Sequence, residues 1–135
     1  MDNMTTAQRS VAMSRVRGSD TKPEIEVRRA LHRLGYRYVL HDRKLPGVPD
    51  LVFPSRGKII FVHGCFWHQH DRCRYASPPT TRVDFWMPKL AANRARDVAN
   101  LAKLRRLGWS VMVVWECELK NHSRAVSRMV KFLDS

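Results

Sequence analysis

Apolar residues recur with a helical period in three parts of the chain and form short strand-like runs in four, with polar turns between them. The first helical pattern begins after a capping Asp20 or Thr21, has Pro23 in its first turn and stops at Gly35. The predicted inward side of this helix carries Ile25, Val27, Leu31 and Leu34. Glu24 would lie near its N-terminus.

Three strand-like runs follow, at residues 36–40, 51–53 and 59–62. The last is an unbroken apolar run between two glycines, which is typical of a strand buried on both faces. A tight turn at residues 54–57 would join the last two runs as a hairpin. This hairpin would bring Asp50, which precedes one strand, close to His63, which ends the other.

The second half of the chain predicts a long loop, a helix, a strand and a terminal helix. Residues 64–88 lack periodicity and contain Pro78, Pro79 and Pro88, so we expect a loop there. The next helix, at residues 89–107, would carry one inward stripe formed by Leu90, Asp97, Leu101 and Leu104. A buried strand at residues 111–115 and an amphipathic helix at 122–133 complete an α/β fold with a mixed central sheet flanked by helices.

The charge of the chain changes this picture by suggesting a partner. The 135 residues include 25 Lys and Arg against 12 Asp and Glu, a net charge of +13, so a polyphosphate such as a nucleic acid is the first expectation. A solvated basic surface or a membrane-surface protein is the alternative. We expect a basic N-terminal arm at residues 1–19, mobile or ordered by a partner, and a single domain at residues 20–135.

No apolar run approaches the roughly 20 residues that span a bilayer, and the N-terminus lacks a signal-peptide core. We therefore expect no membrane association and a cytoplasmic, nucleoid-associated protein. In a reducing compartment the three cysteines would not form disulfides.

The cysteines and nearby histidines instead suggest a metal site. Four soft or borderline ligands suit a closed tetrahedral zinc that clamps the long loop to the sheet: Cys65, His70, Cys73 and Cys117. His68 or His122 could replace His70, and three ordinary buried thiols are the alternative to any metal.

A second group of residues suggests hydrolysis of a phosphodiester. The candidates are Asp50, Glu24, His63, His68 and Asp97. A carboxylate at Asp50 could hold magnesium, and His68 could accept a proton from attacking water. His63 and Asp97 would orient the water or the base. The alternatives are a turn-capping Asp50, a surface ion pair between Asp97 and Arg94, and histidines that satisfy core hydrogen bonds.

Aromatic residues surround these candidates. Phe66 and Trp67 lie between a proposed zinc ligand and the proposed base, and packing them into the core would pull the loop inward. We therefore expect them to be exposed apolar wedges that unstack bases, together with Trp86 and, on the basic arm, Met13. Ordinary packing is the alternative, and for Met13 it is the favoured one.

Five segments carry a resemblance to a known family: LPGVPDLVF (45–53), FVHGCFWHQH (61–70), TRVDFW (81–86), NRARD (93–97) and GWSVMVVWECEL (108–119). They resemble the very-short-patch-repair DNA mismatch endonuclease family over residues 9–119. The resemblance implies a restriction-endonuclease-like fold with a zinc-stapled loop. It also implies a magnesium-dependent nick on the 5′ side of the thymine in a T:G mismatch, such as deamination of 5-methylcytosine leaves in double-stranded DNA.

The resemblance also implies roles for residues. Asp50 and the backbone carbonyl of Val62 would bind the catalytic metals, of which we expect two. His68 would be the base, supported by His63, Glu24 and Asp97. Phe66, Trp67 and Trp86 would intercalate, Met13 would approach from the opposite groove, and zinc would be held by Cys65, His70, Cys73 and Cys117.

The chain departs from the family pattern in one place and from the wider superfamily in another. Asp71 and Arg72 both separate His70 from Cys73, where the family has a single residue. The second hairpin strand of the superfamily usually carries an acid and a lysine, which this chain replaces by the segment 61–63, so a histidine-based variant is implied. A single asymmetric nick suits a monomer. A zinc-stapled DNA-binding module without catalysis and an RNA-binding protein are the rival functions.

Overall fold

Three helices and four strands make up the fold of residues 20–76 and 79–135, which are the residues that the computed structural model describes. The helices are α2 (Lys22–Arg33), α3 (Val83–Arg106) and α4 (His122–Asp134). The strands are β1 (Val39–Leu40), β2 (Leu51–Phe53), β3 (Lys58–His63) and β4 (Ser110–Trp115). Short 3-10 turns lie at Pro54–Arg56, Arg74–Ala76 and Glu116–Lys120. The arm predicted at residues 1–19, with Met13, lies outside the described residues.

The four strands form one mixed sheet in the order β1-β2-β3-β4. β1 and β2 are antiparallel, β2 and β3 form the predicted antiparallel hairpin, and β3 runs parallel to β4. Leu51 pairs with Ile60, so the residue before β2, Asp50, lies beside the C-terminal half of β3. The predicted proximity of Asp50 to the end of β3 is thus a consequence of this register.

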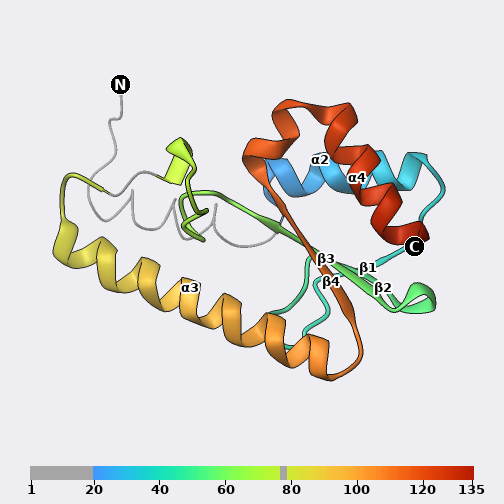
Figure 1. The fold of residues 1–135 in the computed structure, drawn as a ribbon, viewed down its shortest axis with the longest axis horizontal. Helices are drawn as coiled ribbons and strands as arrows, with labels where there is room; N and C mark the ends of the chain where they lie inside the picture. Colours follow the sequence, from blue (N-terminus) through green and yellow to red (C-terminus); the bar gives the residue numbers. More distant parts are fainter. Residues whose placement is uncertain (1–19, 77–78) are drawn as a thin grey trace.

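Helices cover both faces of the sheet, with α2 and α4 on one side and α3 on the other (Figure 1). The first face packs Leu51, Phe53, Ile60, Met112 and Val114 against Val27, Leu31, Met129 and Leu133 of the helices. The second face packs Val52, Ile59 and Phe61 against Leu104 of α3. Burial of the strands on both faces explains their apolar sequences. This mixed α/β arrangement is consistent with a restriction-endonuclease-like fold.

The start of α3 differs from the prediction. The helix begins at Val83, six residues before the predicted start, and contains Pro88. Trp86, predicted in a loop, therefore lies on the helix. A proline inside a helix removes one backbone hydrogen bond. On this first part of α3, Trp86 packs against Phe66 and Trp67.

The first helix and the first strand also differ in detail. Thr21 is the N-cap of α2 and accepts a hydrogen bond from the Glu24 N–H, as the capping pattern predicts. Leu34, predicted to face inward, follows the helix and is 56% exposed. The predicted strand at residues 36–40 is reduced to Val39–Leu40. Among the described residues, no helix combines the length and apolar character needed to cross a bilayer.

Candidate active site

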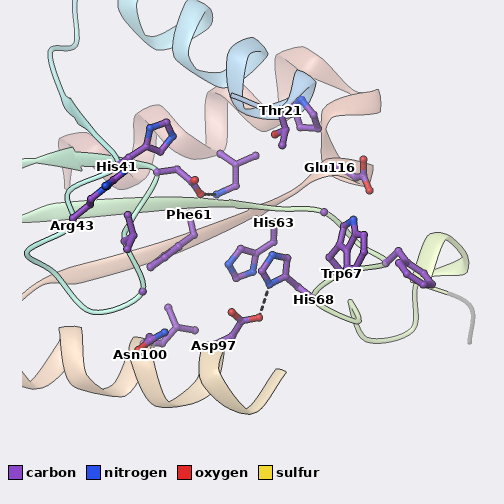
Figure 2. Close-up of a pocket in the computed structure, with 18 residues that line it drawn as sticks. Thr21, His41, Arg43, Phe61, His63, Trp67, His68, Asp97, Asn100 and Glu116 are labelled. Atoms are coloured by element: carbon purple, nitrogen blue, oxygen red, sulfur yellow. Dashed lines mark hydrogen bonds and ion pairs between the residues drawn. The ribbon is translucent and has the colours of Figure 1, made fainter. Parts of the chain in front are cut away.

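A cavity of about 590 Å³ opens where β2 begins and β3 ends. Its walls come from the start of α2, the β1–β2 loop, the end of β3 with the loop that follows, and α3. Asp50, Val62, His63, His68 and Asp97 all line it. Figure 2 shows His63 and His68 side by side near the middle of the cavity, with Asp97 below them on α3. Residues far apart in the sequence therefore meet in one place.

Asp50 lies at one end of the cavity, where its carboxylate is held by the neighbouring strand. Oδ2 accepts the backbone N–H of Val62 at 2.7 Å. Burial raises the pKa of Asp50 to about 7; the Val62 hydrogen bond opposes this shift and the adjacent Glu24 carboxyl adds to it. Without a cation, this carboxyl binds a proton near neutral pH. A positive charge placed beside it would release that proton.

Glu24 of α2 lies next to the Asp50 carboxyl, is almost fully buried and is not among the residues that line the cavity. Its Oε2 accepts hydrogen bonds from Arg28 at 2.7 Å and from Nε2 of His41 at 2.6 Å. Arg28 also forms an ion pair with Asp20. His41 was not among the predicted site residues, because a single histidine in a polar turn gives no signal by itself.

The oxygen atoms around Asp50 suit a hard divalent cation. In an extended strand the N–H and C=O of one residue point toward the same neighbour, so the Val62 carbonyl faces the same edge as its N–H, which contacts Asp50. Two carboxyl groups buried together, at Asp50 and Glu24, also need positive charge for stability. Carboxylate and carbonyl oxygens are the ligands that magnesium prefers. The residues present therefore fit magnesium.

The second end of the cavity holds a histidine pair and a carboxylate. Nδ1 of His68 donates to Oδ2 of Asp97 at 2.6 Å. A carboxylate only accepts, so this bond fixes the proton on Nδ1 and leaves the Nε2 lone pair free to accept a proton. Asp97 faces inward, as its place in the apolar stripe predicted, and it pairs with His68 rather than with Arg94.

His63 stacks on His68, with ring centroids 3.8 Å apart and an angle of 6° between the planes. Burial, and secondarily the neighbouring His68, lowers the pKa of His63 to about 3. His63 is therefore neutral at physiological pH. Its buried Nδ1 has no hydrogen-bond partner within the part of the chain that the structure describes. The neutral His63 ring thus lies flat against the His68 ring.

A cluster of three thiols and one imidazole lies behind the histidine pair. Cys65, His70, Cys73 and Cys117 each offer one ligand atom, and these atoms lie within 4.8 Å of one another. Nδ1 of His70 is 3.7 Å from Sγ of Cys65 and 3.4 Å from Sγ of Cys117. Burial raises the pKa of the Cys65 thiol to about 12. Three cysteines and a histidine at this spacing fit a closed tetrahedral zinc site.

The structure places His70, and neither of the alternative histidines, in this cluster. His68 is bound to Asp97, and His122 contacts Glu26 at 2.8 Å. Arg72 adopts a left-handed backbone conformation with φ of 56°. That turn accommodates the extra residue between His70 and Cys73.

Two residues of β4 and the turn after it connect the cluster to the cavity, and sequence reasoning missed both. The Trp115 ring stacks on His70 with centroids 4.1 Å apart and meets His63 edge-on at 5.2 Å. Oε1 of Glu116 accepts the N–H of Cys65 at 3.0 Å. Their signal was available, because both directly precede the candidate ligand Cys117.

Three aromatic side chains form a cluster where the loop after β3 meets the start of α3. Phe66, Trp67 and Trp86 meet edge-to-face with centroids 5.5 to 5.7 Å apart. The expectation that Phe66 and Trp67 are both exposed is wrong for Trp67, which is only 9% exposed. Its contacts with the other two rings account for the burial. Phe66 and Trp86 are half-buried and remain accessible.

Comparison with known proteins gives consistent matches. A family model described as DNA mismatch endonuclease Vsr matches residues 1–74. The chain is 48% identical over 133 residues to the type II nicking enzyme V.XorIIP of Xanthomonas oryzae pv. oryzae, covering 98% of this chain and 97% of the relative. It is 40% identical to the type II nicking enzyme V.NmeAIP of Neisseria meningitidis, covering 95% and 91%. It is 38% identical to the DNA mismatch endonuclease Vsr of Escherichia coli, covering 87% and 75%.

Proposed function

The chain belongs to the Vsr family of DNA mismatch endonucleases, and from this premise we propose that it nicks duplex DNA on the 5′ side of the thymine in a T:G mismatch, in a magnesium-dependent reaction. The family resemblance inferred from the motifs is confirmed by these matches. The observation that carries the specific proposal is that Asp50 and His68, 18 positions apart, line one cavity.

The Asp50 end of the cavity would hold the metal. Asp50 and the carbonyl of Val62 would bind magnesium, and Glu24 would add negative charge next to them. Bound there, magnesium supplies positive charge that polarises a phosphate oxygen and stabilises charge developing on the leaving oxygen. His41 and Arg28 hold the Glu24 carboxylate in place through its Oε2 atom.

The His68 end would supply the base. Asp97 fixes the tautomer of His68, so Nε2 can accept a proton from water. That water would attack the phosphorus atom in line with the departing 3′ oxygen while its proton passes to Nε2 of His68. The bond between phosphorus and the 3′ oxygen would break, leaving a 5′ phosphate and a 3′ oxygen that takes a proton from solvent. His63 is neutral and its ring stacks on that of His68, so it would orient the His68 imidazole without competing for the proton.

The aromatic cluster would select the substrate. Phe66 and Trp86 stand accessible beside the cavity, with Trp67 buttressing them, and would intercalate at the mismatch. A mismatched pair is easier to unstack than a Watson–Crick pair, so insertion of the rings would favour mismatched over fully paired DNA. Met13 would act from the opposite groove. The cluster of Cys65, His70, Cys73 and Cys117 would hold one structural zinc that fixes the loop carrying Phe66 to His68.

Paired duplexes test this proposal directly. One duplex carries T:G and the other T:A in the same sequence, each incubated with magnesium or with a chelator. We expect one nick, 5′ of the thymine, in the T:G duplex with magnesium alone. Equal cutting of both duplexes would refute mismatch selectivity. Asp50→Ala separates nuclease from pure binding module, because the nuclease would keep DNA binding and lose cutting.

A further inference from the structure

Among the described residues, three carboxyl groups, three histidines and one arginine line the cavity. Asp50, Asp97 and Glu116 contribute carboxyl groups, whereas Arg43 is the one arginine or lysine among the lining residues within the described chain. A DNA backbone phosphate that enters this space brings further negative charge. Like charges at close range repel strongly where water is excluded. A fixed positive group on the wall would reduce that repulsion in addition to any bound cation.

Arg43 extends from an exposed loop toward the cavity and has no polar partner in the part of the chain that the structure describes. Within residues 20–76 and 79–135 its guanidinium forms no hydrogen bond and no ion pair, and the side chain is exposed. Arg28, which does not line the cavity, in contrast forms ion pairs with Glu24 and Asp20. A guanidinium presents five N–H donors in a planar fork that matches two phosphate oxygens. Arg43 is thus available for an anion that comes from outside the protein.

The loop that carries Arg43 is held in a defined conformation. The N–H of His41 donates to the carbonyl of Asp50 at 3.2 Å, which ties the start of the loop to the metal end of the cavity. Oδ1 of Asp42 accepts the N–H of Lys44 at 3.0 Å and closes a tight turn around Arg43. Figure 2 shows His41 and Arg43 on one side of the cavity. A phosphate bound by Arg43 would therefore be positioned relative to Asp50.

Residues of α3 form the opposite wall of the cavity. Figure 2 shows Asp97 and Asn100 of α3 across the cavity from Arg43. Gly47, later in the same loop, contacts Asn100 so closely that an added Cβ would lie 3.1 Å from its side chain. This contact fixes the spacing between the loop and α3.

We propose that Arg43 binds a backbone phosphate of the strand that is cut and so positions that strand between Asp50 and His68. The inference deepens the proposed function and rests on it, because it requires that the cut strand enter this cavity. Lys44 provides a matched control. It is the next residue, carries the same charge and is exposed, yet it does not line the cavity.

The test compares wild type, Arg43→Ala, Arg43→Lys and Lys44→Ala on a T:G duplex. Binding is measured with calcium in place of magnesium across a salt series, and nicking is measured under single turnover with magnesium. Arg43→Ala should weaken binding roughly tenfold, as loss of a charged hydrogen bond does, and reduce the salt slope by about one. Arg43→Lys should recover part of the affinity. Lys44→Ala should change binding by less than about threefold, because it removes only long-range charge.

Neutral methylphosphonate substitutions identify the phosphate. One such substitution is placed at a time along the cut strand. At one position it should weaken DNA binding by wild type and cause no further loss of binding by Arg43→Ala. Equal losses in Arg43→Ala and Lys44→Ala, or the same methylphosphonate profile in wild type and Arg43→Ala, would overturn the Arg43 proposal. The proposed function fails separately: it is refuted if wild type binds the duplex but makes no magnesium-dependent nick.

Discussion

The Asp97 carboxylate holds the His68 imidazole through a 2.6 Å hydrogen bond to Nδ1. The two residues come from α3 and from the loop after β3, so the pair depends on how α3 packs across the sheet. Asparagine at position 97 would retain the shape of the side chain. Its amide could donate to Nδ1 and would then stabilise the tautomer that carries its proton on Nε2, which cannot accept one from water.

We predict that Asp97→Asn lowers the single-turnover nicking rate by about 10²-fold or more, the scale of general-base catalysis, with unchanged DNA affinity. Single-turnover gels and fluorescence anisotropy measure the two quantities. Asp84→Asn, which removes an acid from the first turn of the same helix, is the control. A rate for Asp97→Asn within about threefold of wild type would contradict a base at His68 oriented by Asp97.

The raised pKa of Asp50 predicts that the stability of the metal-free protein depends on pH. Its folded-state pKa of about 7 lies above the ordinary aspartate pKa of 3.8, so the folded state binds the extra proton between these values. The free energy of unfolding should therefore fall as pH rises from about 4 to 7 and level off above that range. Asp50→Asn has no proton to lose and should be the more stable protein at pH 8, by on the order of a few kcal/mol.

Urea denaturation of wild type and Asp50→Asn with chelator, at pH 5 and pH 8, measures this effect. The advantage of Asp50→Asn should be larger at pH 8 than at pH 5, and magnesium should stabilise wild type but not the variant. Asp71→Asn, at an exposed acid, controls for a change in net charge. An advantage that is the same at both pH values would show that burial of the Asp50 charge is not its cause.

Much of the fold and the central part of the site could be predicted because their determinants are local. The short turn at residues 54–57 and the apolar run at 59–62 fix the β2–β3 hairpin, and the hairpin brings Asp50 to the end of β3. The inward stripe of α3 follows from spacing alone, whereas the capping pattern left Asp20 and Thr21 as candidates, of which Thr21 is the cap. Asp97 could be chosen because an acid on an apolar stripe needs a partner.

The remainder depends on contacts between distant segments. Pro88 argues against a helix locally, yet α3 includes it and places Trp86 against the rings of Phe66 and Trp67 from a distant loop. The burial of Trp67 arises from the same contact. His41, at the start of the β1–β2 loop, contacts Glu24 of α2 from 17 positions away, and a pattern in one segment cannot report that.

Substitution of single histidines tests which of them is the fourth ligand of the metal cluster. His70→Ala should lose bound zinc and several kcal/mol of stability, because metal binding contributes to folding free energy. His122→Ala, at the alternative histidine, should retain both, since His122 contacts Glu26 on the surface. Metal content by atomic emission and unfolding temperature are the measurements. Zinc retained by His70→Ala, or lost from His122→Ala, would contradict the assignment of His70 as the fourth ligand.

The aromatic cluster should separate binding of the mismatch from folding. Phe66 and Trp86 are accessible, so Phe66→Ala and Trp86→Ala should each lower nicking of the T:G duplex by about 10-fold to 100-fold, the scale of one lost base–ring stack. Trp67 is buried, so Trp67→Ala should also lower the free energy of unfolding, by about 3–5 kcal/mol. Val98→Ala, at an exposed apolar position of α3, should change neither.

A 2-aminopurine placed beside the mismatch reports unstacking through its fluorescence. Wild type should raise this signal on T:G duplexes far more than on T:A duplexes, and Phe66→Ala and Trp86→Ala should reduce the difference. If both variants bind and unstack the mismatch as wild type does, the rings do not enter the DNA, because an inserted ring is what separates the bases. Selectivity would then have to arise in the cavity itself, from the fit of the strand between Arg43 and His68.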